Sequence, residues 1–127
     1  MRAHVPVLAI LLAAASVSAG NAPTAAVPFG HRFILLLYEG AAFDASVSHV
    51  AEYTAWAREL RTGGRPVTGD EILPGGESLP AGDGLEKERL GGYFVVGARD
   101  LADAVAVGRG CPHRRHGGRV VVRPLAD

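Results

Sequence analysis

The sequence has very little cysteine, lysine and net charge, and each scarcity excludes a class of protein. Cys111 is the single cysteine among 127 residues, so no disulfide can form within one chain and the core must stabilise the fold. Lys87 is the one lysine among thirteen basic side chains, and thirteen acidic side chains balance them. A protein that holds phosphate backbones usually carries a basic excess. We therefore expect no nucleic-acid partner.

Motifs that announce a cofactor are also missing. The chain has no phosphate-binding glycine motif, no Gly-x-Ser-x-Gly elbow and no paired cysteine metal motif. We assign it no cofactor and no metal. What it does have is an apolar fraction of 48%, which is enough to build the packed core of one domain.

The N-terminus has the composition of an export signal. An apolar run from Val5 to Ala15 is followed by the small residues Val17 and Ala19, which suit a signal peptidase that cuts before Gly20. We expect a signal peptide over residues 1–19 and a periplasmic or secreted bacterial protein. A membrane span needs about 20 apolar residues, so we expect no stable membrane anchor after leader removal. An uncleaved anchor is the alternative.

The hydrophobic pattern indicates one domain after a flexible spacer. Residues 20–31 hold two prolines and several small side chains, and the domain covers 32–127. The apolar run 33–38 predicts a strand covered on both faces. A helix capped by Asp44 or Ser46 follows and ends at Gly63-Gly64. Its apolar stripe consists of Val50, Tyr53, Ala57 and Leu60, with Trp56 at the edge.

A strand over 65–73 completes the first β-α-β unit, and a long polar loop over 74–90 follows it. A second β-α-β unit begins with a strand over 92–96. A helix capped by Asp100 then carries Leu101, Ala104 and Val105, and 119–123 is the closing strand. Two such units predict an α+β, ferredoxin-like βαββαβ fold, with a four-stranded antiparallel sheet and two helices on one face. The uncovered face predicts a homodimer.

Three segments resemble YCII-related proteins of the Asp-Gly-Pro-Phe (DGPF) type. Tyr53-x-x-Trp56-x-x-Glu59-Leu60 is similar to the family's first helix, and 87–94 (Lys-Glu-x-Leu-Gly-Gly-Tyr-Phe) is similar to its entry into the third strand. Cys111-Pro112-His113, Gly117-Gly118 and 122–124 (Val-Arg-Pro) resemble its C-terminal end. The resemblance implies a ferredoxin-like fold paired sheet-to-sheet as a dimeric α/β barrel. It also implies that some relatives act on small aromatic or chlorinated molecules with a His–Asp pair. Here Asp83-Gly84 is followed by Leu85, and the Pro and the aromatic residue of the subgroup's motif are missing.

His113, Asp83 and, second to them, His49 are the candidate catalytic residues. His113 can act as a general base, since imidazole titrates near neutral pH. The alternative is a loop histidine that hydrogen-bonds the backbone or caps a helix. Asp83 can orient that imidazole, or it can be the first residue of an Asp-Gly turn. His49 lies at the start of the first helix.

Other polar groups have simpler explanations. A metal site of His49, His113 and His116 lacks tight ligand spacing, which favours solvent-facing histidines. The arginine-rich C-terminal segment, which can attract an anion, is better explained as a solvated face, and Cys111 as a buried or half-buried thiol rather than a reactive one. Tyr53, Trp56, Tyr93 and Phe94 can line an apolar cleft against a partner, but ordinary core packing is favoured.

The sequence thus predicts an exported domain whose activity it does not fix. We expect a small-molecule-binding or accessory module that forms a homodimer. The alternative is a small lyase or isomerase that acts on aromatic or lactone-like compounds through His113 and Asp83.

Overall fold

The computed structural model describes residues 28–81 and 88–127. The predicted leader, most of the spacer and Asp83 lie outside the described residues. The elements are β1 (His31–Glu39), α1 (Val50–Thr62), β2 (Val67–Glu71), β3 (Arg89–Ala98), α2 (Leu101–Arg109), the short 3-10 helix η4 (Pro112–His116) and β4 (Arg119–Pro124).

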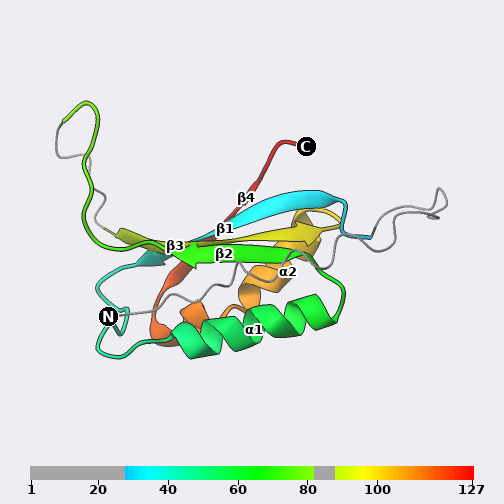
Figure 1. Ribbon diagram of the computed structural model, residues 1–127, viewed down its shortest axis with the longest axis horizontal. Helices are drawn as coiled ribbons and strands as arrows, with labels where there is room; N and C mark the ends of the chain where they lie inside the picture. Colours follow the sequence, from blue (N-terminus) through cyan, green and yellow to red (C-terminus); the bar gives the residue numbers. More distant parts are fainter. Residues whose placement is uncertain (1–27, 82–87) are drawn as a thin grey trace.

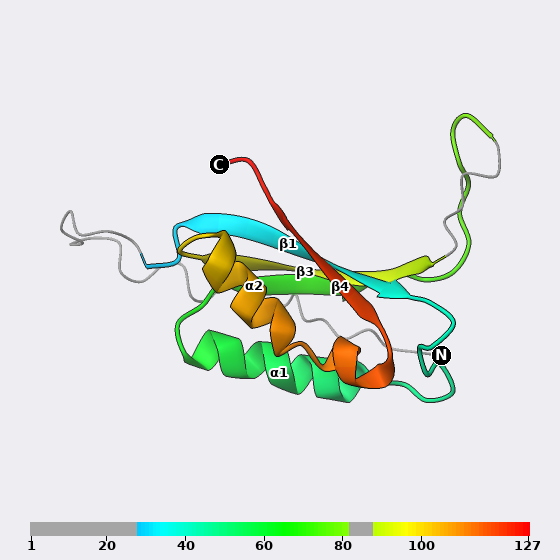
Figure 2. The ribbon, with the colours of Figure 1, turned by 180° about the vertical axis from the view of Figure 1, so that it is seen from behind.

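The four strands form one antiparallel sheet in the order β2-β3-β1-β4. Both helices lie on the same side of it (Figure 1), and the opposite view shows α2 crossing the sheet at an angle (Figure 2). Helix α2 packs on β1, β3 and β4, whereas α1 packs on β2 and η4. This arrangement confirms the predicted ferredoxin-like α+β fold. Neither α-helix in the described part of the chain has the length and apolar run of a membrane span.

Alternation along the two central strands divides the sheet into a buried and an open face. On β1, Phe33, Leu35 and Leu37 are buried, while Ile34 and Leu36 between them are partly exposed, as a period of two requires. The prediction that this strand is covered on both faces is therefore wrong for the single chain, because both helices cover the same side. The open face consists of Ile34, Leu36, Tyr38, Tyr93, Val95 and Val121.

Helix α1 ends as predicted but begins later. Gly63 is its C-cap, and the expected stripe packs on the core through Tyr53, Ala57 and Leu60. The predicted capping by Asp44 or Ser46 is wrong: His49 occupies the N-cap position, and no side chain caps the helix. The Asp44 carboxylate instead accepts hydrogen bonds from the backbone N–H and the hydroxyl of Ser46, which makes a local turn.

Helix α2 has the predicted cap but a different buried stripe. The Asp100 side chain accepts a hydrogen bond from the Asp103 N–H at 2.8 Å, as an N-cap should. The buried face consists of Asp103, Ala104, Val107 and Gly108, whereas Leu101 is half exposed. The apolar pattern predicts Leu101 on this face, which is wrong, because Leu101 is the first residue of the helix and is 50% exposed.

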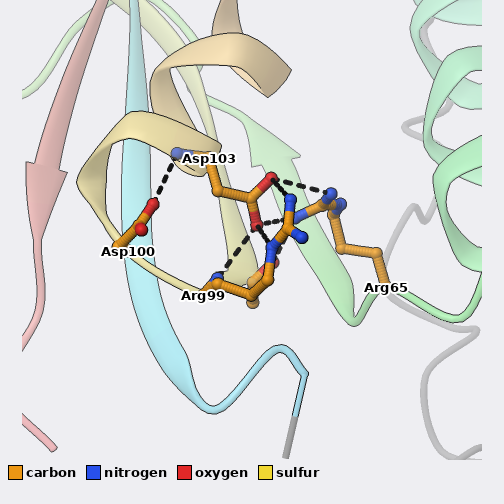
Figure 3. Close-up of polar contacts among 5 residues, drawn as sticks. Arg65, Arg99, Asp100 and Asp103 are labelled. Carbon is orange, nitrogen blue, oxygen red and sulfur yellow. Dashed lines mark hydrogen bonds and ion pairs between the residues drawn. The ribbon is translucent and has the colours of Figure 1, made fainter.

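Asp103 is a buried carboxylate that joins three segments (Figure 3). It pairs in a two-pronged contact with Arg65, at 3.0 and 3.2 Å, and accepts the backbone N–H of Arg99 at 2.9 Å. Arg65 also donates to the carbonyl of Gly97 at 2.9 Å. The hydrogen bonds from Arg65 and Arg99 hold the pKa of the Asp103 carboxyl well below its usual range. The contact therefore ties the end of α1 to the turn between β3 and α2.

Replacing Asp103 should destabilise the protein in a pH-dependent way. Asp103→Asn leaves the Arg65 guanidinium, whose side chain is 15% exposed, without its charge partner, and we expect a loss of about 3–5 kcal/mol at pH 7. Because the folded-state pKa is depressed, this stability is present above pH ~5 and is lost as the pH falls below ~4. Urea unfolding at pH 7 and pH 3 measures both effects.

Asp127→Asn is the matched control, because the Asp127 side chain is 67% exposed and should change the free energy of unfolding by less than about 0.5 kcal/mol. Equal stability of the Asp103→Asn variant and this control at pH 7 would contradict the role given to Asp103.

Candidate functional site

A cavity of about 170 Å³ opens between the start of α1 and the sheet. We call it the α1 cavity. Its walls come from the segment between β1 and α1, from the first two turns of α1, and from the neighbouring ends of β1, β2 and β3. It therefore lies under the sheet within a single chain, on the side that the helices cover.

The lining of the α1 cavity combines an apolar part with a charged part. The apolar part includes Leu37, Phe43, Val47, Val50 and Phe94. The charged residues of the lining are Glu39, Asp70, Glu71 and Arg89. A concave apolar surface with a few polar groups is the usual form of a small-molecule site.

A β-bulge places the pair Glu39–Arg89 in this wall. The β1–β3 register shifts between Leu37 and Tyr38, so that Glu39 pairs with Arg89 across the strands. Arg89 donates to the Glu39 carboxylate at 2.9 Å and to the carbonyl of Ile72 at 3.0 Å. Bulges commonly redirect side chains next to binding sites. Gly91 provides the space that the Glu39 side chain occupies, because a Cβ at position 91 would lie 2.0 Å from a Glu39 carboxylate oxygen.

His113 lies beneath the cavity and is only 1% exposed. Its Nε2 is 2.7 Å from the carbonyl oxygen of Tyr38, and a carbonyl can only accept, so Nε2 carries the proton. Nδ1 of the neutral ring then accepts the Tyr53 hydroxyl proton at 2.8 Å. Burial lowers the pKa of His113, although the bond to Tyr38 works in the opposite direction. At neutral pH the ring is therefore uncharged.

The Tyr53 hydroxyl connects this histidine to the α1 cavity. Tyr53 belongs to the cavity lining, and its single proton goes to His113, which leaves its oxygen as an acceptor. Burial raises the pKa of Tyr53 far above its ordinary value. The pair thus consists of a neutral phenol that donates to a neutral imidazole. In this arrangement the Tyr53 proton can move to Nδ1 of His113.

Two glycines make room for the buried ring. Gly117 ends η4 with a φ of +88°, a conformation that favours glycine. A Cβ on Gly118 would lie 2.1 Å from Nε2 of His113. The Gly117-Gly118 pair therefore lets the chain turn back from η4 into β4 directly over the imidazole.

The sequence-predicted site residues occupy three different settings. His113 is buried, so the solvent-facing alternative is wrong for it. Its hydrogen bond to the Tyr38 carbonyl agrees with the alternative of a histidine that hydrogen-bonds the backbone, and its second hydrogen bond joins it to Tyr53 of the cavity lining. His49 belongs to the cavity wall, and its Nε2 donates to the Asp44 carbonyl at 2.8 Å. Asp83 lies outside the described residues, and its role stays a prediction. The imidazole partner seen on Nε2 of His113 is the Tyr38 carbonyl.

Sequence reasoning missed Glu39, Arg89 and the polar use of Tyr53. The helical spacing of Tyr53 predicts a core residue, and it does pack there, but its hydroxyl makes a separate hydrogen bond to His113. The sequence does mark Glu39 and Arg89 as candidates for a site. Each is a charged residue at one end of an apolar strand, and strand ends from different parts of the chain meet at the edge of a sheet.

The remaining candidates behave as ordinary structural groups. Cys111 is 1% exposed, and burial raises its pKa to about 11, which opposes thiolate reactivity. Phe94 is buried and its ring packs on Tyr53 and Trp56, as core packing predicts. Tyr93 alternates with it and lies on the open face, although it also belongs to the cavity lining at the end of the strand. The arginines of the C-terminal segment are mostly exposed (Arg109, Arg114, Arg115, Arg119 and Arg123).

The Gly118→Ala variant should be destabilised by about 1–3 kcal/mol, because its Cβ overlaps a buried ring that cannot move without losing two hydrogen bonds. Gly63→Ala is the matched control: its φ is −81°, and the nearest atom to an added Cβ lies at 3.6 Å. We expect it to be neutral or slightly stabilising. Urea unfolding compares the two, and equal effects would contradict this account of Gly118.

Comparison with known proteins agrees with this architecture. No curated protein matches the chain. The family model for the YCII-related domain matches residues 32–126. These residues include every described strand and helix, except the first residue of β1. The chain therefore belongs to the YCII-related domain family.

Proposed function

We propose that this domain binds a small molecule in the α1 cavity. The observation that carries the proposal is the cavity itself, of about 170 Å³, with one apolar and one charged part. An apolar cavity of about 150 Å³ is large enough for benzene. The occupant therefore has about the size of one aromatic or lactone ring.

Charge in the walls indicates which compounds the cavity prefers. The lining includes Glu39, Arg89 and Asp70 among its charged residues. Glu39 and Arg89 form an ion pair at 2.9 Å. Asp70 adds a further acidic residue to the lining, which favours a neutral or cationic ring over an anionic one. The Tyr53 oxygen, as an acceptor, favours a ligand with a hydroxyl or amine donor.

The second candidate function is a lyase or isomerase that works by proton transfer in the same cavity. The observation in its favour is the hydrogen bond from Tyr53 to His113. The Tyr53 oxygen takes a proton from the substrate while its own proton moves to Nδ1 of His113. Burial opposes the resulting imidazolium by lowering the pKa of His113, whereas the negative charge of Glu39 acts in the opposite direction. Asp83 remains the sequence-based proposal for a second carboxylate.

Filling the cavity should abolish binding. Thr54 lines the α1 cavity and the adjacent Ala55 is exposed. Consecutive residues point about 100° apart on a helix, so Thr54→Phe adds bulk to the cavity wall and Ala55→Phe adds it to the exposed surface. We expect phenols, aromatic amines or lactones to shift the amide resonances of Tyr93 and Phe94 in NMR titrations. Thr54→Phe should weaken this binding by at least about tenfold, or 1.4 kcal/mol, and Ala55→Phe should not change it.

No shift with any compound, or equal loss in both variants, would overturn the binding proposal. The same titrations separate the two functions. Exchange of a substrate C–H for deuterium that Tyr53→Phe abolishes favours the enzyme, whereas binding without exchange favours the accessory module.

We propose further that the domain acts as a homodimer outside the cytoplasm. Support for the dimer is the open face of the sheet, which carries six partly exposed apolar or aromatic side chains and is covered by no helix of the described residues. Support for export is the signal-like composition of residues 1–19.

Native mass spectrometry of the protein from the cells that make it tests both statements. The expected mass is twice that of residues 20–127. Leu36→Glu places a charge in the middle of the open face and should give monomers, whereas Leu101→Glu, at a position that is 50% exposed on α2, should stay dimeric. A monomer at working concentration excludes the dimer, and retained residues 1–19 exclude cleavage.

A further inference from the structure

Two histidines and a glutamate meet beside the start of α1, next to the α1 cavity. His49, Glu52 and His116 each offer one ligand atom, and these atoms lie within 4.8 Å of one another. We propose that they form a binding site for a divalent transition-metal ion, with Zn²⁺ as the reference ion. This site is independent of the small-molecule proposal, although His49 belongs to both.

The fold brings the three side chains together from two segments. His49 is the N-cap of α1 and Glu52 lies in its first turn, and residues three apart lie on one side of a helix. His116 is the last residue of η4, which packs on α1. The buried bond from Tyr53 to His113 holds η4 in this position.

Asp44 positions both histidines with its backbone. Its N–H donates to the carbonyl of His116 at 2.9 Å, and its carbonyl accepts Nε2–H of His49 at 2.8 Å. The second bond leaves the lone pair of His49 on Nδ1. A metal-binding histidine usually donates its other N–H to a carbonyl or carboxylate in this way.

The ligand set selects the class of ion. Two imidazoles and one carboxylate suit Zn²⁺, Cu²⁺ or Ni²⁺, whereas Mg²⁺ and Ca²⁺ prefer oxygen ligands. Two histidines and a glutamate also leave a fourth position of zinc for water or a ligand. The side chains of Glu52 and His116 are 36% and 23% exposed, so an ion can reach them from solvent.

Binding requires a small rearrangement. Tetrahedral zinc holds its ligand atoms about 3.3 Å apart, and His116 Nε2 is already 2.7 Å from a Glu52 oxygen. The rings of His49 and His116 stack with centroids 3.7 Å apart. The His116 ring must turn out of this stack, because nitrogen lone pairs lie in the ring planes, while His49 keeps its bond to the Asp44 carbonyl. Rotation about the last histidine torsion is broad, and neither ring is enclosed.

Arg115 competes with the ion. It forms an ion pair with the other oxygen of Glu52, and its positive charge opposes a cation at the same carboxylate. Removal of this guanidinium should therefore strengthen metal binding. A purely structural His116–Glu52 hydrogen bond would predict no such gain.

Isothermal titration of Zn²⁺ into the untagged, chelator-treated full chain tests the site. We expect one Zn²⁺ per chain with micromolar or tighter affinity. His49→Ala, His116→Ala and the isosteric Glu52→Gln should each weaken binding at least about tenfold, and Arg115→Ala should tighten it several-fold. The matched control is His31→Ala, at a histidine whose side chain is 59% exposed and contacts Asp127.

Circular dichroism shows whether each variant folds, and Glu52→Gln preserves the test if a histidine variant does not. No heat beyond dilution for the wild-type chain would overturn the proposal. Wild-type affinity in all three ligand variants, or an equal loss in the His31→Ala control, would do the same.

Discussion

The two hydrogen bonds of His113 are the constraint that positions the residues around the α1 cavity and the start of α1. They join Tyr53 of α1, the η4 segment and the Tyr38 carbonyl of β1, which are distant in sequence. A buried imidazole that lost either bond would bear the cost of an unsatisfied polar group. The geometry is therefore fixed, and the glycines at 117 and 118 are the local condition that permits it.

The two proposed sites follow from that one contact. With η4 held on α1, His116 lies beside Glu52, and His49 stacks on His116 while it also forms part of the cavity wall. The other end of α1 is held differently, by the ion pair of Arg65 with the buried Asp103. Buried polar contacts thus fix the helix near both ends, whereas apolar packing through Ala57 and Leu60 holds its middle. Such anchoring suits a helix that carries a binding site, because it holds the wall at a defined distance from the sheet.

Membership in the YCII-related family accounts for the fold but leaves the chemistry to particular residues. The residue on which sequence reasoning relied, His113, acts in the described structure as a buried connector that reaches the cavity through a tyrosine. The residues that line the site are instead charged groups at strand ends, Glu39 and Arg89, whose pairing depends on a one-residue bulge. A bulge changes the register without changing the apolar pattern, so the apolar pattern does not predict that Glu39 pairs with Arg89.

The sequence by itself determined the order of elements, the antiparallel sheet and the helical stripe of α1, because periods of two and of three to four residues encode which side of an element is buried. It also determined the Asp100 cap and the end of α1 at Gly63, which depend on neighbours only a few residues away. The tertiary structure alone decided the contacts of His113 with Tyr53, of Asp103 with Arg65 and of Glu52 with His116. Each of these contacts joins side chains tens of residues apart, and a hydrogen bond or ion pair leaves no periodic trace along the chain.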